Sequence, residues 1–208
     1  SGFKIAMRDL EIRGAGNLLG AQQHGHMEAV GYDLYCKMLN EAVKHLKGEM
    51  EEEDYTTTID LNIDAYIPDT YISNEYQKLD IYKRIAAIES EEEMEDMVEE
   101  LIDRFGDIPK KVEMLLTVAQ LKALAHKVYV TAVEQKGDTY TFAMYERAKV
   151  CPEKIPALLK EFRDDLAFKA EPPMFIYRKK RINKRDKTES VLEVVKNVLI
   201  GIKGLLGS

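Results

Sequence analysis

The 208-residue chain has no tryptophan, only two cysteines and only six prolines. Cys36 and Cys151 lie far apart, and neither belongs to a Cys-x-x-Cys pair. This spacing excludes a disulfide-rich scaffold and a cysteine zinc site, and it is typical of a reducing cytoplasm. No stretch approaches the roughly 18 consecutive apolar residues of a membrane span, and the N-terminus lacks a signal-peptide pattern. The sequence therefore predicts a cytoplasmic globular protein without a membrane segment.

Nucleotide-binding motifs are also missing. The chain contains neither a G-x-x-x-x-G-K-[ST] loop nor an acidic Mg²⁺-binding box after a strand. It opens at Ser1-Gly2 without an initiator methionine, so we expect a piece of a larger protein that carries no ATPase site, no catalytic residue and no cofactor of its own. The net charge of −7 argues against a protein that simply coats DNA, although a local basic patch can still bind it.

The first 30 residues are rich in glycine, with Gly14, Gly16, Gly20 and Gly25 set among polar side chains. Glycine is favoured where the backbone needs a positive φ or must approach another group closely. Polar residues between such turns commonly reach a partner. His24 and His26 are two residues apart and would not share a helix face, so we expect no metal site there. The pattern indicates a functional loop with short helical pieces.

This stretch resembles the translocation motif that RecG shares with the transcription-repair coupling factors, two kinds of DNA translocase. The matching pattern is Asp9-Leu10-x-x-Arg13-Gly14-x-Gly16-x-Leu18-Leu19-Gly20-x-x-Gln23-x-Gly25. The sequence from Arg8 to Gly16 resembles the coupling factors more closely than it resembles RecG. The resemblance implies that five residues couple ATP turnover to movement along double-stranded DNA: Asp9, Arg13, Gly14, Gly16 and Gln23. From the residues alone, an intramolecular salt bridge from Arg13 to Asp9 or Glu11 is as good an interpretation as a functional role.

Two later stretches, Leu79–Ala86 and Glu100–Pro109, resemble the C-terminal domain of the coupling factors, which RecG lacks. In physical terms these stretches are helix faces followed by a helix stop. Arg84, Asp103 and Arg104 are the charged residues in them that we expect to form a buried or interfacial ion pair, with a structural role first and an interface role second.

Hydrophobic spacing predicts the elements. Residues 31–47 have a helical apolar stripe, residues 48–55 form an acidic linker, and Thr56–Ile67 alternates as a half-buried strand does. The remaining expectations are a helix capped by Ser73, a helix from Ser90 to Gly106 with a capping box, a helix from Pro109 to about His126, a hairpin of Val128–Val133 and Thr139–Met144, a helix from Pro152 to about Arg163, a strand at Met174–Tyr177 and a helix from about Glu189.

These elements predict an α+β fold. An N-terminal helical and loop appendage (1–47) precedes the acidic linker (48–55) and a small mixed α+β domain (56–208) with a few strands and several amphipathic helices. The leucine, isoleucine, valine and methionine stripes are core positions, and none of them indicates a cofactor.

Residues 178–187 hold seven basic residues in ten, including Arg178, Lys179, Lys180 and Arg181. Such a run can follow nucleic-acid phosphates. The favoured interpretation is instead a solvated turn between a strand and the last helix. Docking against an acidic partner surface is a third interpretation. The basic run supports an alternative function for the whole chain, a free-standing nucleic-acid-binding module.

The resemblance implies that the parent protein is an ATP-dependent double-stranded-DNA translocase that removes stalled RNA polymerase and recruits the repair protein UvrA. ATP and Mg²⁺ would then be bound by the missing motor. Residues 56–208 would pack on the parent's N-terminal UvrA-binding module and mask it.

Overall fold

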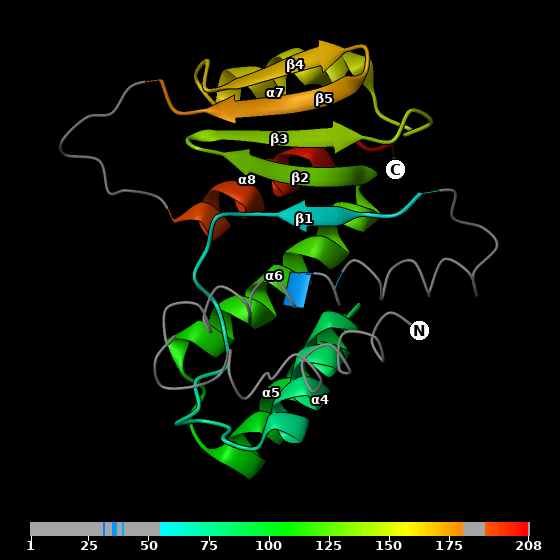
Figure 1. The fold of residues 1–208 in the computed structure, drawn as a ribbon. Coiled ribbons are helices and arrows are strands. Elements are labelled where there is room, and N and C mark those ends of the chain that lie inside the picture. The colour runs from blue at the N-terminus through cyan, green and yellow to red at the C-terminus, as the bar shows by residue number, and fades with distance from the viewer. Residues whose placement is uncertain (1–30, 32–34, 37–38, 40–54, 181–189, 208) are drawn as a thin grey trace. The chain divides into compact units, whose positions relative to one another are not determined.

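The computed structural model describes residues 31, 35–36, 39, 55–180 and 190–207. The described residues fall into two compact units. One contains residues 64–120 with the few described residues before Tyr55, and the other contains residues 55–63 and 121–207. The expected domain 56–208 contributes to both units, and the division into 1–47, 48–55 and 56–208 stays a prediction. Figure 1 shows the helices and the sheet.

The first unit is helical. Helix α4 (Glu75–Ala86) begins at Asn74, whose side chain accepts a hydrogen bond from the Gln77 amide at 3.0 Å. The expected cap was Ser73, one residue earlier. That prediction is wrong because Asn74 supplies the oxygen that the first helical turn needs. Gly31, Tyr35, Cys36 and Leu39 are helical, as the apolar spacing of 31–47 predicted, and the side chains of Tyr35 and Leu39 are buried.

Helix α5 (Glu91–Phe105) follows, and Ser90 caps it by accepting from the Glu93 amide at 3.1 Å. The predicted capping box is shifted by one residue, since the Glu93 carboxylate accepts from the Glu89 amide rather than from that of Ser90. Gly106 ends the helix at φ 90°, as predicted.

Helix α6 (Lys110–Lys127) has its first part in this unit and its last part, from Leu121, in the other. It begins after Pro109 as predicted. The expected stripe is fully buried and consists of Val112, Leu115, Leu116 and Ala119.

The second unit is built on a mixed sheet with the order β1-β2-β3-β5-β4 among the described residues. Its strands are β1 (Thr58–Asp60), β2 (Val130–Lys136), β3 (Thr139–Met144), β4 (Leu166–Ala170) and β5 (Pro173–Arg178). Strand β1 runs parallel to β2, and the other neighbours are antiparallel. The hairpin of β2 and β3 was predicted, and its turn contains Gly137 at φ 61°.

Helix α7 (Ile155–Glu161), preceded by the 3-10 turn Pro152–Lys154, and helix α8 (Val191–Lys203) complete this unit. Both helices lie behind the sheet in Figure 1. Five side chains of α8 are buried: Val194, Val195, Val198, Leu199 and Ile202. The α+β class is therefore confirmed.

Two expectations about strands differ from the structure. The predicted strand Thr56–Ile67 shrinks to three residues, because β2 offers pairing partners only to Thr58, Ile59 and Asp60. The alternation of burial nevertheless continues through Leu61, Ala65 and Ile67. Strand β4 was not predicted, since only Leu166 of its five residues is fully buried and its alternation is weak.

Candidate functional site

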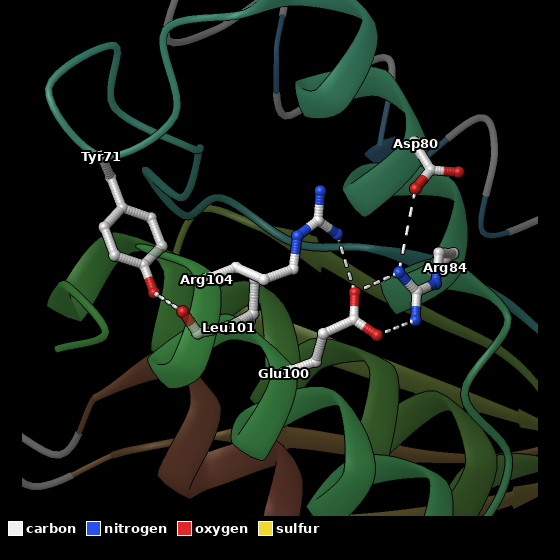
Figure 2. A network of polar contacts seen from close by, with 6 residues as sticks. All are labelled: Tyr71, Asp80, Arg84, Glu100, Leu101 and Arg104. Atoms are coloured by element: carbon white, nitrogen blue, oxygen red, sulfur yellow. Dashed lines mark hydrogen bonds and ion pairs between the residues drawn. The ribbon is translucent and has the colours of Figure 1, made fainter. Parts of the chain in front are cut away.

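Helices α4 and α5 place a cluster of charged side chains on the surface of the helical unit (Figure 2). We call the four residues Asp80, Arg84, Glu100 and Arg104 the Glu100 cluster. Arg84, near the end of α4, binds both carboxylate oxygens of Glu100 in the middle of α5, and the contact from Nη2 to Oε1 measures 2.5 Å. This two-pronged geometry is the one in which an arginine binds a carboxylate most strongly.

Glu100 also accepts from Arg104, one helical turn later, at 2.8 Å. Asp80 completes the cluster at 3.8 Å from Arg84. The hydrogen bonds from Arg84 first, and then those from Arg104, lower the pKa of Glu100 from 4.5 to about 2. The same hydrogen bond raises the pKa of Arg84. The lowered pKa of Glu100 and the raised pKa of Arg84 keep this pair ionised throughout the physiological pH range.

The three residues predicted for an interfacial ion pair have different outcomes. Arg84 and Arg104 come together, and Glu100 joins them. Asp103 is exposed and has no part in the cluster. Residues four apart on a helix are neighbours, as Glu100 and Arg104 are, whereas the adjacent Asp103 and Arg104 point in different directions.

Tyr71 fixes the end of α5 beside the cluster. Its hydroxyl lies 3.1 Å from the Leu101 carbonyl and 2.9 Å from that of Gly106, two acceptors at the end of the helix. Burial first, and then the charge of Asp107, raise the pKa of Tyr71. The guanidinium of Arg104 lies 4.8 Å from the centre of the Phe105 ring, a cation–π contact. These contacts hold the cluster in one arrangement.

Two buried tyrosines have hydroxyl groups that form hydrogen bonds with the backbone, and this role was not predicted from the sequence. The Tyr35 hydroxyl donates to the Leu115 carbonyl at 2.7 Å, and the Tyr82 hydroxyl accepts from the Ile67 amide at 2.8 Å. Burial raises the pKa of both hydroxyls. A tyrosine within an otherwise apolar helix stripe is the signal that could have found them, because a buried hydroxyl needs a partner.

The described part of the basic run lies at the end of β5. Arg178 Nε is 3.4 Å from the Asp138 carboxylate, and the Lys180 amide donates to Asp165 at 3.0 Å. Lys179 is half-buried. Arg181 and the rest of the run lie outside the described residues. The Arg178 charge is therefore already opposed by a carboxylate.

The predicted translocation residues also lie outside the described residues: Asp9, Arg13, Gly14, Gly16 and Gln23. Within the described ranges, no group of three or more His, Cys, Asp or Glu side chains is placed to hold a metal ion. None of the helices in those ranges is both long and apolar enough to cross a membrane.

The fold and the cluster define a class, a small α+β domain that carries an ordered network of ion pairs on its surface. Comparison with known proteins narrows this class. A family model described as the TRCF domain matches residues 61–155.

Relatives among characterised proteins agree. The chain is 43% identical over 208 residues to the transcription-repair-coupling factor of Bacillus subtilis strain 168. This alignment covers 99% of this chain and 17% of the relative. It is 49% identical over 150 residues to that of Staphylococcus haemolyticus strain JCSC1435, covering 71% of this chain and 13% of the relative. The chain thus spans about a sixth or less of the length of these relatives.

A crystal structure of the C-terminal domain of a transcription-repair coupling factor is similar in fold. Its TM-score is 0.54 at 27% identity, over 73% of this chain and 92% of that one. The chain belongs to the transcription-repair-coupling factor family.

Proposed function

We propose that this chain is the C-terminal part of a transcription-repair coupling factor and that it has two tasks there. Residues 1–47 couple ATP turnover in the motor to translocation along double-stranded DNA. Residues 56–208 keep the UvrA-binding module of the same protein masked until a conformational change frees it. The family membership carries this proposal, and the likeness to a solved C-terminal domain supports it.

In this proposal ATP and Mg²⁺ are bound in the motor of the parent, and this chain binds neither. RNA polymerase and UvrA are partners of the parent, and the partner of residues 56–208 is the N-terminal UvrA-binding module. Masking needs no chemistry from this chain, only a surface that holds its shape.

The Glu100 cluster is our candidate for that surface. Two arginines are locked around one carboxylate, so little side-chain freedom remains to be lost on docking. The side chains are still accessible, since Arg84 is 41% and Arg104 37% exposed. The two guanidinium groups and the Glu100 carboxylate between them are held in fixed positions, which gives a partner a defined pattern of charge to match.

The test is UvrA binding by the full-length parent against a version that ends near Asp54. The shortened protein should bind UvrA much more tightly. Truncation also uncovers Tyr35 and Leu39, whose side chains are buried in the whole chain, so the shortened protein should carry a polar residue at Leu39 to prevent nonspecific adhesion.

A second arm keeps the domain and changes its surface. Arg84→Glu combined with Arg104→Glu in the full-length parent should raise UvrA affinity, while Lys110→Glu, on an exposed residue of α6 in the same unit, should leave it unchanged. Equal UvrA binding by the full-length and shortened proteins would remove the masking proposal. Salt-dependent DNA binding through the basic run 178–187 would then be the alternative to measure.

A further inference from the structure

Among the described residues, helices cover one face of the sheet. Phe142 of β3 pairs with Phe175 of β5 and Tyr140 with Tyr177, and all four side chains are buried. The ring of Phe162, just after α7, meets Tyr177 edge-on with ring centres 6.1 Å apart. Helices α7 and α8 both lie on this side of the sheet (Figure 1). Directly opposed residues of a sheet share a face, so the alternate positions point the other way.

The opposite face is unusually apolar at its centre. Ala143 pairs with Met174, and Ile176 lies between Thr141 and Ala167 across three strands. Ala143, Met174 and Ile176 are half-buried, although α7 and α8 are on the other side. The solvated face of an antiparallel sheet ordinarily carries polar residues at such positions. We call this side the open face.

Charged residues occupy the two edges of the open face, with opposite signs. Asp60 of β1 and Glu134 of β2 are direct neighbours in the register, and both are exposed. Like charges directly opposite one another destabilise a sheet. Neither acid forms an ion pair with any residue that the structure describes. At the other edge, Lys169 of β4 is exposed and likewise has no ion-pair partner in the described ranges.

We propose that the open face is the contact surface for a second copy of this chain. In a two-fold dimer whose axis runs along β3 between two facing sheets, β1 of one copy lies over β4 of the other, and β2 lies over β5. Each acidic edge then faces the Lys169 edge of its partner, and the apolar centres meet. Such an interface is self-complementary by symmetry, so the contact between the acidic edge and the Lys169 edge occurs twice.

The spacing permits these contacts. Facing sheets lie about 10 Å apart, and Lys169 is about 7 Å along the strand direction from the row that contains Asp60, a gap that a lysine side chain can help to bridge. Lys136 and Arg178 share the open face at its hairpin end. Arg178 is already paired with Asp138, and the twist of two stacked sheets separates their corners, so these cations lie at the rim.

The size of the face sets the strength of the association. Five strands about 4.8 Å apart and about 20 Å long present on the order of 400 Å² per copy. This is about half of the roughly 800 Å² per partner of a standard stable interface. The dimer should therefore be weak and should appear only at high protein concentration.

Sedimentation equilibrium of the whole chain, from about 10 µM to about 1 mM, tests the proposal. We expect a monomer–dimer equilibrium within this range. Asp60→Lys places lysine against Lys169 at both contacts, and Lys169→Glu places like negative charges there. Each variant should weaken association by about tenfold or more. A chain that stays monomeric up to about 1 mM overturns the proposal.

An equimolar mixture of the two variants provides the sharpest comparison. A mixed dimer has opposite charges at both contacts, so association should return to that of the wild-type chain. Glu161→Lys and Lys196→Glu are matched controls, since they make the same charge changes on exposed positions of α7 and α8, behind the sheet. Dimerisation that the variants and their mixture leave unchanged would show that another surface is used and would overturn the proposal. Circular dichroism of each variant confirms that it is folded.

Discussion

Replacing Glu100 by glutamine tests whether the Glu100 cluster stabilises the fold as its geometry indicates. Glutamine has nearly the same shape, so the change removes the charge and leaves the packing of α4 against α5 in place. Arg84 and Arg104 would lose the carboxylate that both of them contact. Glu99→Gln is the matched control, because Glu99 is an exposed neighbour on the same helix.

The magnitude follows from the pKa. At about 1.36 kcal/mol per pH unit, the fall of the Glu100 pKa from 4.5 to about 2 corresponds to an upper limit of about 3 kcal/mol. Water screens the pair, since 31% of the Glu100 side chain and 41% of that of Arg84 are exposed. Measured exposed ion pairs contribute about 0.2 to 1 kcal/mol each. We therefore expect Glu100→Gln to lower the free energy of unfolding by about 1 to 1.5 kcal/mol at pH 7.

The pH dependence gives the direction of the test. A carboxyl whose pKa is lower in the folded state stabilises the fold above its unfolded pKa, and this contribution disappears as the pH falls through the folded pKa. The difference between the wild-type chain and Glu100→Gln in urea unfolding should be full above about pH 5 and should shrink toward zero near pH 2. A difference that does not change with pH, or one no larger than that of Glu99→Gln, would refute the reasoning.

Three further substitutions test other contacts by the free energy of unfolding in urea. Tyr82→Phe should cost about 1 to 3 kcal/mol because it leaves the buried Ile67 amide without its acceptor, whereas Tyr76→Phe, at a residue 64% exposed, should be neutral; equal costs would contradict this account. Gly106→Ala should cost about 1 to 3 kcal/mol, since φ is 90° with ψ −164° at this helix end and alanine disfavours that region; a neutral result would show that the turn relaxes. Gly201→Leu should cost more than about 2 kcal/mol because even a Cβ would lie 2.6 Å from Leu158 Cδ1, while Gly207→Leu, with open space around it, should be tolerated.

Much of the fold could be predicted because local signals and burial agree. Ser90 and Gly106 bound α5 as their capping properties require, and the apolar stripe of α6 is buried as its spacing indicates. Strand β1 was overextended because alternation reports burial, whereas a ladder also needs a partner strand. Strand β4 was missed because an edge strand is buried on one side of a short segment only, so its pattern is faint.

The candidate site was only partly visible in the sequence. Arg84 and Arg104 were identified by their place in a family pattern. Asp103 was expected as the acidic residue of the ion pair, whereas Glu100 is the carboxylate that both arginines contact. The distance between Arg84 and Glu100 is set by how α4 packs on α5, and no local pattern contains that information. The pairing of Asp60 with Glu134 likewise depends on the register of a parallel strand pair far apart in the sequence.

The most direct test of masking uses two separate proteins. This chain, produced alone, is titrated into the isolated N-terminal UvrA-binding module of the same parent, and UvrA is then added as a competitor. The account predicts a one-to-one complex that UvrA displaces and that Arg84→Glu with Arg104→Glu weakens. Absence of a complex, or a ternary complex in which UvrA and this chain bind the module together, would contradict it.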